Sequence, residues 1–332
     1  MRCCTKDAVN VESPKKVVVG ETEEDTREEE NPYEDLPTVT VTLSDGSVYT
    51  GTTKDNRVHG RGVLKYVNGD QYEGEFVDGK KEGKGKWTDK ENNTYEGDWV
   101  KDKRHGHGVY KTAEGFIFEG EFANNKREGK GTIITPEKTK YVCSFQDDEE
   151  VGEVEFFFAN GDHALGYIKD GYLCQNGRYE FKNGDIYVGN FEKGLFHGEG
   201  YYKWNNDANY TIYEGNYSEG KKHGKGQLIN KDGRILCGMF RDNNMDGEFL
   251  EISPQGNQTK VLYDKGFFVK VLDKIEENLD VQEFLKDSII HTTIFSDPTT
   301  YKKLYEITEK KKPQFRLNLK RTQPTSHHHH HH

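Results

Sequence analysis

Long apolar runs and paired cysteines are scarce in this sequence of 332 residues. No stretch approaches the ~20 apolar residues of a membrane-spanning helix, and no secretory signal peptide is visible. The five cysteines include no C-x-x-C pair and no disulfide-type spacing, which favours a reducing compartment. We therefore expect a cytoplasmic protein.

Apolar residues are also few, at 32% of the chain, whereas ordinary globular domains are nearer half apolar. A thick two-layer core is therefore not expected. The net charge of −11 argues against nucleic acid as a partner, because phosphate binding requires a basic surface. In contrast, the chain is rich in glycine (36 residues) and in aromatic residues (19 Tyr, 18 Phe and 3 Trp). A thin structure that buries aromatic rings against backbone fits this composition.

Signatures of catalysis are missing as well. The sequence has no G-x-G-x-x-G after a strand, no Walker loop, no G-x-S-x-G elbow and no set of zinc ligands. We expect a protein that is not an enzyme and that uses no cofactor and no metal. The last six histidines, 327–332, are typical of a purification tag.

A repeat of about 23 residues dominates the chain. A residue that is aromatic in most copies recurs nine times at intervals of 23, apart from one interval of 26, and glycine follows it two positions later in every copy except the fifth. A three-residue insertion within 205–210 accounts for that longer interval. The first residues of the nine copies are Tyr49, Tyr72, Tyr95, Phe118, Tyr141, Ala164, Tyr187, Tyr213 and Leu236.

Each copy has two halves that alternate with period two, which predicts two β-strands. In the second copy we expect a six-residue loop, with Gly74 opposite Gly85, Tyr72 opposite Trp87, and Phe76 opposite Gly83. Glycine weakens a strand, so its regular use needs a reason. We expect the aromatic rings to lie flat over the glycine pairs. The other face then carries cross-strand pairs such as Glu73 with Lys86.

These features predict an all-β fold. We expect an elongated single-layer antiparallel β-meander of nine 23-residue hairpin repeats, twisted and curved, with a short C-terminal helical cap. Nine hairpins give about 18 strands. The sheet should occupy residues 38–266.

The motif Tyr-Glu-Gly-Glu/Asp-Phe/Trp followed by His/Glu-Gly-x-Gly resembles the MORN (membrane occupation and recognition nexus) repeat family. Residues 72–76, 95–99, 118–122 and 213–217 match it closely. The resemblance covers roughly residues 39–258 and implies a single-layer sheet that serves as a scaffold or partner-binding surface. The chain is most similar to plain repeat-array proteins of cilia and cytoskeleton, such as radial spoke head components.

Two candidate surfaces follow from the period. The first is a partner-binding groove lined by aromatic residues: Tyr72, Phe76, Trp87, Tyr95, Trp99, Tyr110, Phe118 and Phe122. The second is a basic edge with two alternatives, a solvated edge or a docking site for acidic partners or anionic phospholipids. Its residues are Arg57, Lys80, Lys81, Lys103, Arg104, Lys126 and Arg127.

The fifth and sixth copies depart from the pattern. Cys143 and Val154 replace glycines, and Phe156, Phe157 and Phe158 stand in a row. We consider either a bend or docking patch, or neutral drift. Histidines recur at one repeat position, as His59, His105, His197 and His223, but about 10 Å apart, too far to share a zinc ion. We interpret these histidines as structural.

Outside the sheet, residues 1–37 form an acidic segment that we expect to be disordered. Cys3 and Cys4 are candidates for palmitoylation. Residues 267–295 are predicted to be a helical cap over the last strand, or alternatively a docking helix for a homodimer, and residues 296–326 a basic tail.

The preferred hypothesis is a non-enzymatic scaffold that binds protein partners in a ciliary (axonemal, radial-spoke-like) or cytoskeletal assembly. The alternative is a peripheral membrane scaffold that binds anionic phospholipids through the basic edge. The sequence does not identify the partner.

Overall fold

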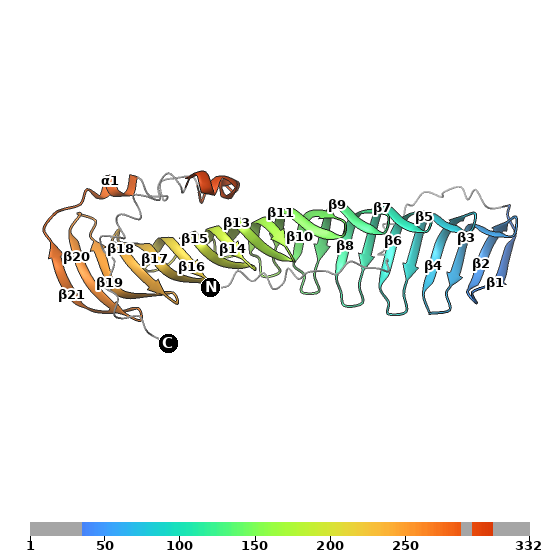
Figure 1. Cartoon of the computed structure of the whole chain (residues 1–332), viewed down its shortest axis with the longest axis horizontal. Helices are drawn as coiled ribbons and strands as arrows, with labels where there is room; N and C mark the ends of the chain where they lie inside the picture. Colours follow the sequence, from blue (N-terminus) through green and yellow to red (C-terminus); the bar gives the residue numbers. More distant parts are fainter. Residues whose placement is uncertain (1–34, 287–293, 308–332) are drawn as a thin grey trace. The chain divides into compact units, whose positions relative to one another are not determined.

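The computed structural model describes residues 35–286 and 294–307, and these form 21 strands of one antiparallel sheet with short helical pieces near the C-terminus (Figure 1). The described chain divides into two compact units between Gly152 and Glu153, which we call the N-terminal and C-terminal units. Consecutive strands pair antiparallel from β1 to β10 and from β11 to β21. The all-β prediction is therefore confirmed.

The first strands are β1 (Thr38–Thr42), β2 (Val48–Lys54), β3 (Arg57–Lys65), β4 (Gln71–Val77), β5 (Lys80–Thr88), β6 (Thr94–Val100), β7 (Lys103–Lys111), β8 (Ile117–Ala123), β9 (Lys126–Ile134), β10 (Lys140–Gln146) and β11 (Glu149–Phe157). They are followed by β12 (His163–Lys169), β13 (Tyr172–Glu180), β14 (Ile186–Glu192), β15 (Leu195–Lys203), β16 (Tyr210–Ser218), β17 (Lys221–Asn230), β18 (Ile235–Arg241), β19 (Asn244–Ile252), β20 (Gln258–Asp264) and β21 (Phe267–Ile275). The helical pieces are α1 (Val281–Lys286) and η3 (Thr300–Lys303), and residues 304–307 continue as helix.

The nine predicted repeats correspond to β2 through β19, two strands to each. Strand β1 precedes them and the pair β20–β21 follows them, so the sheet has more strands than the sequence predicted. The prediction of a helical segment from residue 267 is wrong at its start. Its residues Phe267–Ile275 pair with β20 as strand β21.

The predicted hairpin register is confirmed near the glycines and wrong near the turn. Gly74 lies opposite Gly85 and Tyr72 opposite Trp87, but Phe76 lies opposite Lys81 and not Gly83. Between the pairs Gly74–Gly85 and Phe76–Lys81, β4 has only Glu75 whereas β5 has residues 82–84, so a β-bulge in β5 shifts the pairing beyond it. The same break follows the glycine in most repeats, for example between Gly97 and Trp99, Gly120 and Phe122, and Gly215 and Tyr217.

The bulge also shortens the loop. The strands extend to Val77 and resume at Lys80, which leaves a two-residue turn in place of the expected six-residue loop. Asp78 and Gly79 in this turn have φ angles of 49° and 85°. Such turns twist in the same sense as the strands that they join, and they favour Asp, Asn and Gly.

One face of the sheet, which we call the aromatic face, carries the rings and the glycine pairs. A Cβ on Gly85 would lie 2.1 Å from the Tyr72 hydroxyl, and one on Gly74 would lie 2.5 Å from the Gly85 Cα. The rings therefore lie over glycine backbone, as predicted. In the N-terminal unit neighbouring rings meet edge to face with centroids 4.9–5.4 Å apart, from Tyr49 with Phe76 to Phe118 with Phe145.

The opposite face of the C-terminal unit has a second layer. Ile235, Cys237 and Ile252 lie on that face and are fully buried. The chain after β21 covers them with Phe284, Ile294, Phe295, Tyr301 and Leu304 in one apolar cluster. The cap therefore packs on a face of the sheet and touches the last strand only at its end, through Ile275, while Phe267 stays 77% exposed. The prediction of a basic tail over residues 296–326 is wrong at its start, because Tyr301 and Leu304 are buried in this cluster.

Candidate functional site

The residues that we expected to line a groove form the core of the N-terminal unit instead. Each of the eight is between 0% and 8% exposed. Their rings pack on one another and on glycine backbone, so little of their surface is left for a partner. These residues stabilise the fold, and whether a partner binds over this face stays a prediction.

The basic edge splits into two sets. Arg57, Lys80, Lys103 and Lys126 are exposed. The next residue in the later pairs turns onto the aromatic face, where Arg104 and Arg127 are 3% and 1% exposed. The edge therefore presents about half of the cations that the sequence predicted, because strand alternation sends neighbouring side chains to opposite faces.

The inward cations cover the aromatic rings. Lys81 Nζ lies 5.0 Å from the ring centroid of Trp99, the Arg104 guanidinium 5.5 Å from that of Phe122, and the Arg127 guanidinium 4.6 Å from that of Phe145. At these distances a cation is attracted to the face of a ring. Burial lowers the pKa of Arg104 to about 10, and the guanidinium stays charged at neutral pH.

Side chains in the turns link each repeat to the next. The amides of Lys81, Arg104 and Arg127 donate to the side-chain oxygens of Asp102 (2.8 Å), Asn125 (3.0 Å) and Asp148 (2.7 Å). The recurrent histidines serve the same purpose, since His59 Nδ1 accepts the amide of Asp78 at 3.1 Å. In an equivalent position Glu82 accepts the amide of Lys101 at 2.7 Å. The geometry supports the structural interpretation of these histidines.

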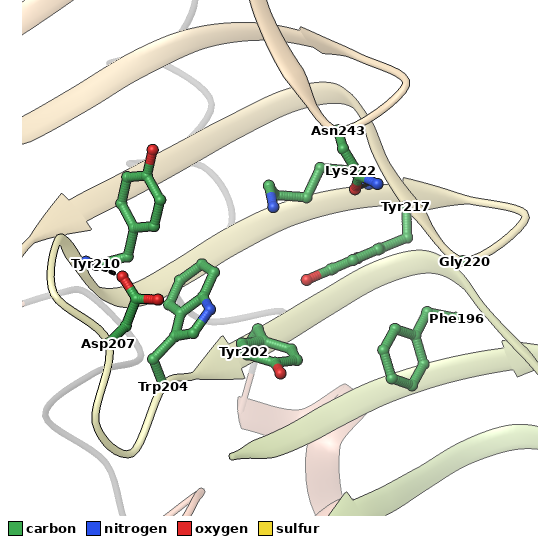
Figure 2. Close-up of a pocket in the computed structure, with 9 residues that line it drawn as sticks. All are labelled: Phe196, Tyr202, Trp204, Asp207, Tyr210, Tyr217, Gly220, Lys222 and Asn243. Carbon is green, nitrogen blue, oxygen red and sulfur yellow. Dashed lines mark hydrogen bonds between the residues drawn. The ribbon is translucent and has the colours of Figure 1, made fainter. Parts of the chain in front are cut away.

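An open aromatic cleft lies on the aromatic face of the C-terminal unit (Figure 2). We call it the Trp204 cleft; its volume is about 290 Å³. It is lined by Phe196, Tyr202, Trp204, Asp207, Tyr210, Tyr217, Gly220, Lys222 and Asn243. Sequence reasoning noted the insertion within 205–210, but it did not connect the insertion with Lys222.

The insertion builds one wall of the cleft. Trp204 donates its amide to the carbonyl of Thr211 at 2.9 Å, which closes an enlarged turn. Within that turn the Asp207 carboxylate accepts the amides of Asn209 (2.8 Å) and Tyr210 (3.0 Å). Tyr202 is fixed by donating its hydroxyl to Asp185 at 2.5 Å. The wall is therefore held by hydrogen bonds while the ring of Tyr210 stays 36% exposed.

Lys222 supplies the positive charge of the cleft. Its Nζ lies 5.4 Å from the ring centroid of Trp204 and 5.6 Å from that of Tyr213. No carboxylate in the described residues forms an ion pair with it. Burial lowers the pKa of Lys222 to about 8, and burial also raises the pKa of Tyr217. The cleft thus combines apolar rings with a poorly hydrated cation.

The irregular repeats are mostly internal. Phe156 and Phe158 are 0% and 4% exposed and their rings stack at 5.2 Å, so they do not form a surface patch. Phe157 alone is 42% exposed, on the normally polar face, where its ring packs against His163. A docking role there stays a prediction that depends on one ring.

The remaining sequence predictions concern metal binding, membrane spanning and the two ends of the chain. In the described part of the chain, no cluster of three or more His, Cys, Asp or Glu side chains is arranged to hold a metal ion. No helix within the described ranges has the length and hydropathy needed to span a membrane. Cys3, Cys4, most of the acidic segment 1–37, and the tail beyond residue 307 lie outside the described residues.

The fold and its repeated hairpin define a β-sheet repeat protein. The MORN repeat model matches residues 49–71, 72–94, 95–115, 118–139, 187–208 and 213–233. The chain therefore belongs to the MORN repeat family. The matches leave out residues 140–186, where the sequence departs from the pattern.

No match was found among curated proteins. Many solved structures match, among them the SAS-4 (dCPAP) TCP domain in complex with a proline-rich motif of Ana2 (dSTIL) of Drosophila melanogaster. That structure is 14% identical, with a TM-score of 0.31, over 57% of this chain and 97% of the other.

Proposed function

We propose that this MORN-repeat chain is a non-enzymatic scaffold that binds protein partners in a ciliary (axonemal, radial-spoke-like) or cytoskeletal assembly of the cytoplasm. The observation that supports it most is the Trp204 cleft, an accessible aromatic surface on a face whose rings are mostly buried. Aromatic residues are enriched where proteins bind one another.

Cross-linking in the native cell tests this function. A tagged full-length chain is localised by microscopy and cross-linked to its neighbours, and the cross-linked peptides are identified. Enrichment at the axoneme or cytoskeleton, with cross-links to structural components, is the expected outcome. A matched pair of variants locates the contact: Tyr210→Ala in the cleft wall, and Tyr305→Ala, exposed at 71% in the same unit. A diffuse chain without reproducible cross-links would overturn the proposal.

The alternative is a peripheral membrane scaffold. It is favoured by one observation, the four exposed cations Arg57, Lys80, Lys103 and Lys126, one to each successive repeat along one edge. Each basic residue near an anionic surface contributes about 1 kcal/mol. Vesicles with phosphatidylserine should bind the chain at 150 mM salt, and Lys-to-Glu changes at Lys80, Lys103 and Lys126 should abolish that binding. No binding at low salt would remove this alternative.

A homodimer also stays a prediction. The segment expected to mediate it, residues 267–295, packs Phe284, Ile294 and Phe295 against the sheet of its own chain. Light scattering of the full chain would decide it.

A further inference from the structure

Lys222 has an internal counterpart whose partners are known. Lys81 occupies the same position in the second repeat, and there its Nζ donates to the hydroxyl of Tyr66 at 3.2 Å. The amide of Lys81 is bound by Asp102, whose negative charge also favours the protonated lysine. The ammonium at this position in the repeat is therefore hydrogen-bonded to a hydroxyl and favoured by the charge of a nearby carboxylate.

Both partners are replaced around Lys222. Trp204 stands where Tyr66 stands, because each donates its amide across the turn at 2.9 Å and each lies under its lysine. An indole N–H is a donor only, so Trp204 cannot accept a hydrogen bond from the ammonium. Asn243 replaces Asp102 and still accepts the amide of Lys222, at 2.9 Å, but it carries no charge. The cation has lost its acceptors where the cleft opens.

A second polar group points into the same space. Tyr217 occupies the position that Phe76, Trp99 and Phe122 hold in other repeats. Its side chain is only 6% exposed, and no residue in the described ranges forms a hydrogen bond with its hydroxyl. Figure 2 shows this hydroxyl and Lys222 Nζ directed toward the space bounded by Trp204 and Tyr202. A hydroxyl without a partner in the protein is free to donate to a ligand that enters this space.

The charges around the cleft set the sign of the ligand. Asp207 is the only carboxylate among the lining residues, and its oxygen already accepts two amides. Lys231 Nζ donates to the Asp207 carbonyl at 3.4 Å, which places a second cation beside it. The ammonium of Lys222, the amide of Asn243 and the hydroxyl of Tyr217 are all donors, and a carboxylate accepts from several donors at once.

We propose that the Trp204 cleft binds an extended segment of a protein partner in which an aspartate or glutamate follows an aromatic or proline residue. The carboxylate binds Lys222, Asn243 and Tyr217, and the preceding ring stacks on Trp204 and Tyr210. The cleft of about 290 Å³ is large enough for one ring and a short acidic side chain, near the lower limit of ligand pockets. This inference rests on the proposed protein-binding function and names the partner chemistry of that site.

Calorimetry with paired peptides tests the proposal on the full chain. The probe is the peptide Gly-Pro-Phe-Glu-Gly with blocked ends, and its twin carries glutamine in place of glutamate. The glutamate peptide should bind at least about tenfold more tightly than its twin, because a charge-assisted hydrogen bond is lost in the twin. Lys222→Met should remove that preference. Lys81→Met, the matched change in the second repeat, should leave it intact.

Two further variants keep the test independent of folding. Tyr217→Phe restores the aromatic residue without a hydroxyl found in other repeats, and it should weaken the glutamate peptide several-fold and its twin less, because a hydrogen bond to a charged carboxylate is stronger than one to a neutral amide oxygen. Asp207→Asn keeps the turn and should tighten the glutamate peptide. Equal binding of the twins, or no binding of either, overturns the proposal. The proposal is also overturned if the chain binds phosphatidylserine vesicles but neither peptide, and if Lys222→Met abolishes the vesicle binding.

The two proposals fail separately. Cellular cross-links at other surfaces would leave the scaffold function standing while the peptides fail. If the peptides bind as expected but the chain has no structural neighbours in the cell, only the scaffold function is contradicted.

Discussion

The hydroxyl of Tyr95 donates a 2.7 Å hydrogen bond to the backbone carbonyl of Asp98. Asp98 lies opposite the β-bulge of its repeat, residues 105–107 of β7, and has no register partner in β7. Four other repeats have the same bond, from Tyr49, Tyr72, Tyr187 and Tyr213, at 2.6–2.9 Å. The tyrosine thus satisfies a carbonyl that the β-bulge removes from the ladder, which explains why the repeat uses tyrosine more often than phenylalanine.

Tyr95→Phe should lower the free energy of unfolding by about 1 kcal/mol, because the carbonyl of Asp98 loses its partner in a buried place. Urea unfolding measures the change. Phe118→Tyr is the matched reverse change, in a repeat that lacks the hydroxyl, and it should stabilise the chain. If both variants shift stability in the same direction, the hydroxyl is not the cause.

Glycine is needed for two separate reasons, and substitutions should separate them. Gly85→Ala places a Cβ 2.1 Å from the Tyr72 hydroxyl and should cost about 1–3 kcal/mol by overpacking. Gly79 has no atom within 4 Å of its would-be Cβ, but its φ is +85°, so Gly79→Ala should cost about 1 kcal/mol through backbone strain. Truncation of Tyr72 to alanine should reduce the cost of Gly85→Ala in a double-mutant cycle and leave that of Gly79→Ala unchanged.

The sequence was sufficient for the period, the strand pairing at the glycines and the ring-over-glycine contact. Gly74 with Gly85 and Tyr72 with Trp87 followed from alternation about a hairpin. The bulge in β5, where residues 82–84 lie opposite Glu75 alone, did not follow, because it leaves the repeat period unchanged while it shifts the register toward the turn. The same shift explains why the six-residue loop was wrong.

Long-range packing was the other limit. Ile235, Cys237 and Ile252 lie on a face that is polar in other repeats. Their apolar side chains were a signal that another segment covers this face. No pattern in the sequence placed the covering segment, because it returns from beyond the last strand of the sheet. The Trp204 cleft was missed for a related reason: the insertion before β16 and the lysine in β17 become neighbours only once these two strands pair.

Arg127 and Lys126 test the division of the basic edge. The Arg127 side chain is 1% exposed, packs on Phe145, and donates to the carbonyl of Asp148 at 2.7 Å. Arg127→Ala should therefore destabilise the chain by about 3–5 kcal/mol, since Asp148 loses its buried ion-pair partner. Lys126→Ala, at the exposed neighbour, should change stability by less than about 0.5 kcal/mol. Thermal unfolding of both variants makes the comparison, and equal effects would contradict it.

Cys237 reports on the C-terminal cover. Its thiol is fully buried in one cluster with Phe295, and burial raises its pKa. Phe295→Ala should open the cluster and increase maleimide labelling of Cys237, as measured by mass spectrometry of its peptide. Cys143, buried in the N-terminal unit, is the internal control and should label as before. Unchanged labelling of Cys237 would show that the segment does not protect this face.

We expect Lys222 to lower the free energy of unfolding of the chain, as is common for residues of a binding site. Burial lowers its pKa to about 8 in the folded chain from an ordinary value of 10.5. Below pH 8 lysine is protonated in both states, so the folded state carries the full cost of burying the charge. Between pH 8 and 10.5 the unfolded chain binds more protons, and stability relative to a non-titrating residue rises with pH.

Lys222→Met should therefore raise the unfolding midpoint at pH 7, and its advantage over the unchanged chain should shrink as pH increases from 8 to 10.5. Lys81→Met is the matched control. Burial also lowers the pKa of Lys81, but Asp102 opposes the shift, so its pH-dependent difference should be smaller. Chemical unfolding at several pH values measures both. A constant difference between Lys222→Met and the unchanged chain across this range would mean that the ammonium is well hydrated, and the cleft would then lack the dehydrated cation that makes it selective for a carboxylate.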